Sequence, residues 1–222
     1  MKRRTMPVAA ALAATAALLL TACGGGDDSS KGDNDKIAGA GTEGSGSPSP
    51  SASASAPTEK NAPSFDFPSD IKVTVDREST GDATKDAILR DVAYSTQANI
   101  EAFAKGVGQT SNMNRYFAAA ALTYWAKRVE TVKKDGLTVT GDYRYYDFEV
   151  TDVVNGKAAA ARYCEDQSKA FGKEIKTGKV LRTKASNKSF VLYTLQAQKS
   201  ATGDWQVTQQ NWKRGAASCV QG

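Results

Sequence analysis

The chain has 222 residues, no histidine, three cysteines and a formal net charge of +5. Without histidine, Ser-His-Asp and Cys-His catalysis and imidazole-ligated zinc are excluded. The cysteines, which are distant from one another in the sequence, are too few for a thiolate metal site, so we expect no metal and no cofactor.

The N-terminus has the pattern of a bacterial lipoprotein signal. Lys2, Arg3 and Arg4 precede an Ala/Leu-rich run over 8–20. A helix of that length rises about 20 Å, too short for a bilayer core of roughly 30 Å, so we predict a signal peptide over 1–22. The end of the run, "LTAC" at 20–23, resembles a lipobox, whose cysteine receives a diacylglyceryl group and becomes the first mature residue. We therefore predict lipidation of Cys23 and a location on the outer face of the cytoplasmic membrane. A secretory signal with a chance cysteine is the alternative.

The segment 23–64 is predicted to be a disordered tether. It is rich in Gly, Ser and Pro and has no aromatic residue, so it cannot bury enough apolar surface to fold. O-linked glycosylation of its Ser/Pro stretch is an alternative to a plain spacer. All tryptophans, tyrosines and phenylalanines follow it, which predicts one folded domain over 65–222.

Two helical regions open this domain. Apolar side chains three and four residues apart predict a long helix from Asp82 or Thr84 to Gly106, after an extended lead-in at 71–75. A second helical region begins near Ser111 and ends at Gly136, and we expect a break within 113–118.

Alternating patterns then predict about four antiparallel strands, at 137–153, 157–164, 190–198 and 205–213. Asn155-Gly156 predicts the first hairpin turn, and "IKTGKVL" at 175–181 a short turn on the rim. The apolar phase flips between Tyr145 and Tyr146, which predicts a bulge there. Helices followed by a curved antiparallel sheet define an α+β fold.

Five motifs carry a family resemblance over roughly 70–220. They are "GLTVTG" at 136–141, "YCEDQS" at 163–168, "TGK" at 177–179, "DWQV" at 204–207 and a terminal Cys219. In order and spacing they resemble actinobacterial secreted lipoproteins with an NTF2-like, cone-shaped domain. The resemblance implies helices packed on a curved sheet, and a fold that hosts isomerases, cyclases and binding modules alike.

The two cysteines left after lipidation are Cys164 and Cys219. An even remainder in an oxidising compartment predicts a disulfide between them. A reactive thiol is the alternative, although the chain has no imidazole to activate one.

Candidate functional side chains fall into three groups. The carboxylates available for acid–base chemistry are Asp142, Asp147, Glu149, Glu165 and Asp166, and alternation places Asp147 and Glu149 toward solvent. Aromatic residues that could line a pocket or simply fill the core are Tyr94, Tyr116, Tyr124, Trp125, Tyr143 and Tyr145. Cations that could meet an anionic surface, or form an ordinary solvated face, are Lys173, Lys176, Lys179 and Arg182.

We name no catalytic residue and predict a non-catalytic module that binds a small apolar ligand or an envelope protein, and no nucleic acid. The alternative is an acid–base enzyme of the isomerase or cyclase type. The inside of the cone decides between them, because a carboxylate at the floor of an open aromatic pocket would support the enzyme.

Overall fold

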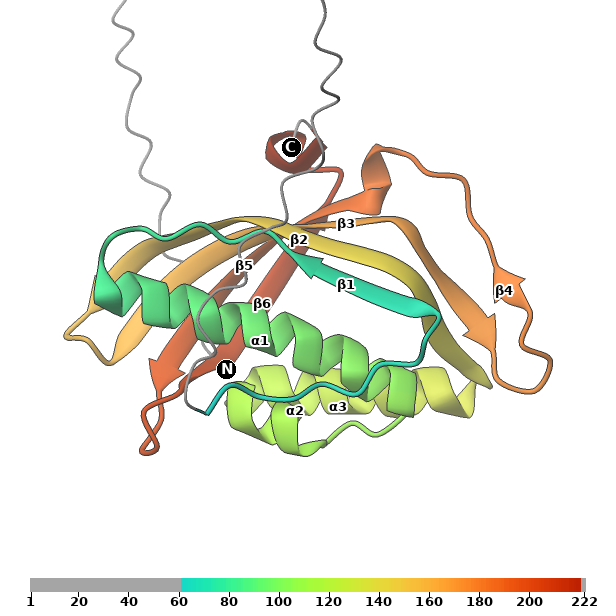
Figure 1. Ribbon diagram of the computed structural model, residues 1–222, viewed down its shortest axis with the longest axis horizontal. Helices are drawn as coiled ribbons and strands as arrows, with labels where there is room; N and C mark the ends of the chain where they lie inside the picture. Colours follow the sequence, from blue (N-terminus) through green and yellow to red (C-terminus); the bar gives the residue numbers. More distant parts are fainter. Residues whose placement is uncertain (1–60, 221–222) are drawn as a thin grey trace, which may run out of the picture. The chain divides into compact units, whose positions relative to one another are not determined.

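The computed structural model describes residues 61–220 (Figure 1). The predicted signal peptide, Cys23 and most of segment 23–64 lie outside the described residues. The elements in chain order are β1 (Ile71–Val75), α1 (Ala83–Lys105), α2 (Ser111–Tyr116), α3 (Ala119–Lys134), β2 (Leu137–Val154), β3 (Ala158–Glu174), β4 (Val180–Leu181), the 3-10 turn η1 (Asn187–Ser189), β5 (Phe190–Lys199), β6 (Trp205–Arg214) and α4 (Ala217–Val220). Within 61–220, no helix combines the length and the apolar character needed to cross a membrane.

The long helix α1 begins and ends where its capping residues predict. The Asp82 carboxylate accepts hydrogen bonds from the backbone N–H groups of Thr84 and Lys85, and Gly106 ends the helix in the left-handed conformation. The expected break in the second helical region is also present. Phe117 and Ala118 are extended and separate α2 from α3.

One sheet of six strands runs in the order β1-β2-β3-β5-β6, with β4 paired to β3. The expected count of about four strands is therefore too low. The lead-in at 71–75 becomes β1 because it pairs in parallel with β2, and 180–181 becomes β4 because it pairs with the end of β3. The strand expected to end at Cys164 continues to Glu174, since β3 pairs with β2 over nearly the full length of that strand.

The predicted bulge in β2 is present, one residue later than the pattern indicated. The β2–β3 register shifts between Tyr146 and Glu149, and Asp147 has a positive φ of 52°. Tyr145 before the bulge and Phe148 after it both contact the main core. Tyr146 does not join them; it lies in a second cluster with Cys164 and Cys219.

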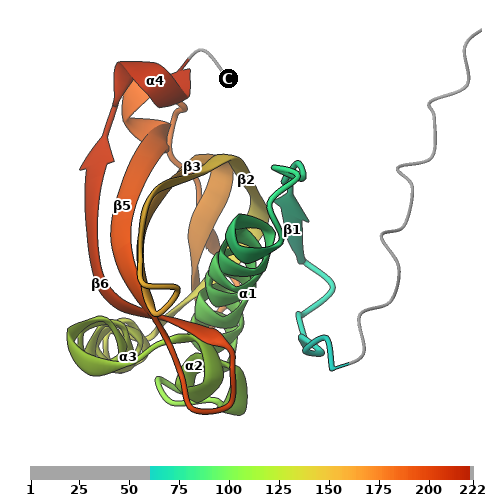
Figure 2. The ribbon, with the colours of Figure 1, turned by 90° about the vertical axis from the view of Figure 1, so that its left-hand side faces the viewer.

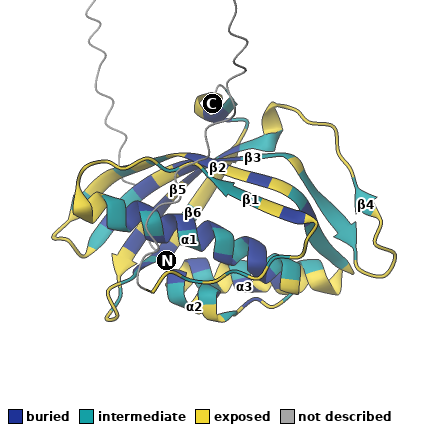
Figure 3. Cartoon of the chain, in the orientation of Figure 1, coloured by how far each residue is buried: buried dark blue, intermediate teal, exposed yellow. Residues whose placement is uncertain are grey.

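The main core lies between the helices and the concave face of the sheet. Figures 1 and 2 show α1 and α3 against one face of the sheet and α4 on the opposite side. Side chains of α1, such as Ile88 and Val92, are buried in one core cluster together with strand residues such as Val191 and Val207. Figure 3 shows the buried residues gathered on these facing surfaces, while the segment from β4 to β5 is largely exposed.

The short C-terminal helix α4 is fixed to the sheet by a disulfide. Cys164 in β3 is bonded to Cys219 in α4, which confirms the predicted pair and closes a loop of 55 residues. The Tyr146 hydroxyl donates a hydrogen bond to the Cys219 carbonyl oxygen. Cys164 lies within β3 rather than at its end, so the bridge holds the tail against the middle of the strand.

Candidate binding site

A cavity of about 560 Å³ lies between α1, α3 and the concave face of the sheet. Its volume falls within the range of small-molecule sites in proteins. Side chains of α1 and α3 form one wall, and residues of β2, β3, β5 and β6 form the other. The lining residues used below are Asn99, Phe103, Tyr124, Trp125, Arg128, Tyr143, Glu165, Gln167, Ala170, Gly172, Tyr193, Trp212 and Arg214.

Glu165 in β3 is the acidic residue of this lining, and its side chain is almost entirely buried. Tyr145 donates a hydrogen bond to its Oε1 atom at 2.8 Å, and Gln167 Nε2 donates one to its Oε2 atom at 2.7 Å. The Tyr193 hydroxyl also hydrogen-bonds this carboxyl group. The carboxylate is thus held by three donors inside an aromatic enclosure.

Burial dominates the electrostatics of this cluster. It raises the pKa of Glu165, while the hydrogen bonds and the charge of Arg214 act in the opposite direction. Burial and the neighbouring Glu165 raise the pKa values of Tyr145 and Tyr193 well above the ordinary range. The tyrosine hydroxyls therefore keep their protons and act as hydrogen-bond donors.

A chain of polar contacts links this cluster to the mouth of the cavity. Arg214 donates from Nη1 to Gln167 Oε1 at 3.0 Å, on the far side of the amide that holds Glu165. Gln210 in β6 donates to the hydroxyl of Tyr163 in β3 and accepts from Nε1 of Trp125 in α3, both at 2.8 Å. Glu165, Gln167 and Trp125, which line the cavity, are therefore held by partners on several elements.

A second hollow of about 780 Å³ is lined by Asn61, by residues of α1 and α2 and by the turn before β6, and half of its lining residues are charged. Its charges are paired internally. Arg90 contacts Asp91 at 2.8 Å, and Arg115 contacts Asp204 at 2.9 Å. Asp91 also accepts the Trp205 backbone N–H, so these residues join α1, α2 and β6. We assign this hollow a structural role.

The aromatic candidates divide between cavity and core. Tyr124, Trp125 and Tyr143 line the cavity as expected. Tyr116 is fully buried in the core, and Tyr94 lines the second hollow instead. The Tyr145 ring is buried beneath the cavity, where its hydroxyl holds Glu165.

The other acidic candidates lie away from the cavity. Asp142, Asp147 and Glu149 are exposed, and Glu149 forms an ion pair with Arg162. Asp166 is half-buried and accepts the Ser168 backbone N–H at 2.7 Å. Glu165 alone among the five faces the aromatic interior.

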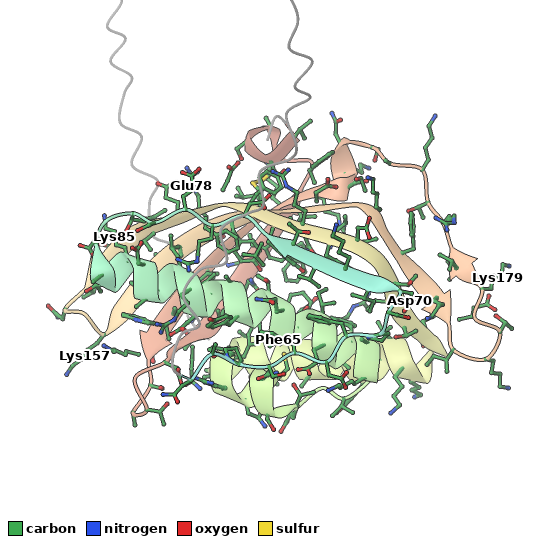
Figure 4. All side chains as sticks on the ribbon, in the orientation of Figure 1. Phe65, Asp70, Glu78, Lys85, Lys157 and Lys179 are labelled. Carbon is green, nitrogen blue, oxygen red and sulfur yellow. A yellow bond between two sulfur atoms is a disulfide. The ribbon has the colours of Figure 1, made fainter. Side chains whose placement is uncertain are left out.

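The four basic candidates occupy one end of the domain in unequal environments. Lys173 is in β3 and bonds Asp70 at 2.5 Å, while Arg182 lies over the Phe171 ring at 5.2 Å. Lys176 and Lys179 are exposed on the turn before β4. Figure 4 labels Lys179 and Asp70 at this same end. Contact with an anionic surface stays a prediction, and Lys176 and Lys179 on the turn are the residues that would make most of this contact.

Sequence reasoning missed Asn99, Arg128, Gln167 and Arg214. For Gln167 a signal was available, because residues 163, 165 and 167 alternate onto one face of a strand that runs past Cys164. Asn99 and Arg128 carried no comparable signal, since a polar residue on a helix is usually solvent-exposed. Among the described residues, no group of three or more histidine, cysteine, aspartate or glutamate side chains is arranged to hold a metal ion.

Comparisons with known proteins find likenesses in structure alone. No protein-family model and no curated protein matches the sequence. A ketosteroid isomerase-like protein from Erwinia carotovora atroseptica is 18% identical with a TM-score of 0.40, over 61% of this chain and 98% of that one. An NTF2-like superfamily protein from Salmonella enterica serovar Typhimurium is 11% identical with a TM-score of 0.40, over 61% and 94%. The intermembrane space region of the chloroplast protein ARC6 is 14% identical with a TM-score of 0.38, over 56% and 92%.

At these scores we take the fold class from the chain's own elements. Helices packed on a curved, mainly antiparallel sheet confirm the predicted α+β class.

Proposed function

We propose that this protein is a ligand-binding module that takes a small, largely apolar molecule into the cavity between α1, α3 and the sheet. The observation that supports this function is the composition of the cavity. Aromatic and aliphatic side chains line about 560 Å³, and a few polar groups reach it from several elements. Binding requires only this enclosure and makes no demand for a catalytic motif.

The test is binding of an uncharged hydrophobic dye, phenylnaphthylamine, followed by its fluorescence. Ala170→Phe should abolish binding, because Ala170 lines the cavity and the added ring would fill it. Gly172→Val is a second, smaller obstruction at a position where an added Cβ meets only ordinary contacts. Ala201→Phe, on the exposed turn before β6, is the matched control. If both obstructing variants fold and bind the dye as the wild type does, the cavity is not the site.

Acid–base catalysis is a second candidate, favoured by Glu165 alone. A buried carboxyl group with a raised pKa is a stronger base than an ordinary carboxylate and can accept and return a proton. Incubation of a cavity-sized ketone in heavy water should then show deuterium uptake next to the carbonyl group by NMR. Uptake that is lost in Glu165→Gln would support the enzyme. Binding of the ketone without deuterium uptake would favour the binding module over the enzyme.

We also propose that the domain is held on the outer face of the cytoplasmic membrane by lipid on Cys23. The signal-like sequence over 1–22 and the small residues before Cys23 support this proposal. The mature protein should fractionate with membranes, and Cys23→Ala should release it or leave it unprocessed. A fully processed wild-type protein in the soluble fraction would contradict the anchor. An envelope protein is the alternative partner, and pull-down from native membranes tests it.

A further inference from the structure

Asn99 brings an unused hydrogen-bond donor to the cavity. It lies on α1, one turn before Phe103, and lines the cavity. Its Nδ2 atom is buried and has no hydrogen-bond partner among residues 61–220. Most buried side-chain polar atoms in proteins are hydrogen-bonded, so an unpaired amide beside a cavity points to a partner that enters with the ligand.

Arg128 provides a second donor from the opposite helix. It lies on α3, one turn after Tyr124, and its exposed side chain also lines the cavity. Within the described part of the chain, no hydrogen bond or ion pair engages it. By contrast, Arg144 and Arg162 each bond a carboxylate. The Arg128 guanidinium is thus free to bind an anion.

The charges around the cavity favour an anionic ligand. Arg128 and Arg214 face a single acid, Glu165. The Glu165 carboxylate is already held by Tyr145, Tyr193 and Gln167. The polar groups left for a ligand are therefore mainly donors, and the balance of charge is positive.

The mouth of the cavity provides a surface for an apolar body. Tyr124, Trp125 and Trp212 form a group with ring centroids 5.1–5.8 Å apart. Tyr124 and Trp212 are 44% and 43% exposed, although both are large aromatic residues. Exposed rings beside a cavity are suited to cover a flat or aliphatic ligand.

We propose that the cavity binds a hydrophobic organic anion, whose acidic group is held by Arg128 and Asn99 and whose body lies against Tyr124, Trp125 and Trp212. This inference rests on the proposed binding function and specifies its ligand class. Arginine binds a carboxylate or sulfonate through paired N–H groups, and the Asn99 amide adds a donor from the facing helix.

Two dyes that share their rings and differ in one anionic group test the inference on the full chain. Anilinonaphthalenesulfonate carries the anion, and phenylnaphthylamine lacks it. We expect the sulfonate to bind at least about tenfold more tightly, as a charged hydrogen bond predicts. Arg128→Gln and Asn99→Ala should each remove most of this difference in affinity. The affinity of either variant for phenylnaphthylamine should stay within about twofold of the wild-type value.

Lys127→Gln is the matched control, since it removes a charge from the neighbouring, exposed position of α3, which does not line the cavity. Arg128→Lys keeps the charge and should retain part of the preference. Equal affinity for the two dyes, or an equal loss in Lys127→Gln and Arg128→Gln, would overturn the anion site. Binding of phenylnaphthylamine that Ala170→Phe abolishes would still support the cavity. Failure of both dyes to bind would contradict the proposed binding function as well.

Discussion

Glu165→Gln is the sharpest test of the polar cluster beneath the cavity. In the wild type, three donors meet the Glu165 carboxylate, from Tyr145, Tyr193 and Gln167. A glutamine at this position has one accepting oxygen. If that oxygen faces Tyr145 and Tyr193, its NH₂ group meets the Gln167 NH₂ group; if it faces Gln167, the two tyrosine hydroxyls lose the acceptor of their protons. Rotation of the Gln167 amide does not help, because its oxygen already accepts from Arg214 at 3.0 Å. At least one buried donor is therefore left without an acceptor in either orientation of the introduced amide.

An unsatisfied buried polar group costs about 1–3 kcal/mol, and we expect Glu165→Gln to lower the free energy of unfolding by this amount. Adding Gln167→Glu should restore most of the loss. The carboxylate introduced at position 167 accepts from the amide introduced at position 165 and from the Arg214 guanidinium at once. The coupling between the two substitutions should therefore be positive and of similar size.

Urea unfolding of the wild type, both single variants and the double variant measures this coupling by linear extrapolation. The two substitutions together leave the count of acidic groups unchanged, so net charge does not account for a recovery. A double variant that is destabilised by the full sum of the single effects would refute the proposed network.

Three further predictions concern pH, the disulfide and the cavity wall. Because burial raises the pKa of Glu165, the folded protein keeps a proton that the unfolded chain releases above its ordinary value of 4.5. The free energy of unfolding should therefore fall as pH rises from 4.5, with this group contributing up to about 1.4 kcal/mol per pH unit. Urea unfolding of Glu165→Gln at a series of pH values should lack this pH dependence. An unchanged slope would contradict the raised pKa. Replacing Cys164 and Cys219 by serine should cost about 4 kcal/mol in the chain-entropy account of a 55-residue loop, and a loss under about 1 kcal/mol in urea would contradict it. Asn99→Leu should raise the free energy of unfolding by about 1 kcal/mol, because it removes a buried amide that has no partner, and it should weaken binding of the sulfonate dye. A melting temperature below that of the wild type would show that the Asn99 amide is paired in the folded protein.

Local patterns in the sequence predicted the elements whose ends depend on local chemistry. Asp82 and Gly106 bound α1 through capping contacts that involve only near neighbours in the chain. The Asn155-Gly156 turn set the first hairpin for the same reason, since both residues have positive φ values. The disulfide followed from cysteine count and compartment rather than from geometry.

Features that depend on pairing between distant segments were not predicted. The end of β3 depends on how far β2 can pair, and Leu137 lies opposite Glu174. That error placed Glu165 at a strand end, where its side chain had no assigned face. The place of Asn99 in the cavity depends on how α1 meets α3 and the sheet, which no local pattern in α1 encodes.

The extended pair Phe117–Ala118 has a consequence for how this protein can meet others. The Ala118 N–H donates to the Val207 carbonyl oxygen, and Phe117 forms a parallel bridge to Val207, on the outer edge of β6. The edge is therefore covered at this point by the chain itself, and beyond it β6 ends in Lys213 and Arg214. Covered and charged edges discourage a foreign strand from extending a sheet. A protein partner that bound by adding a strand to β6 would first have to displace the link between α2 and α3.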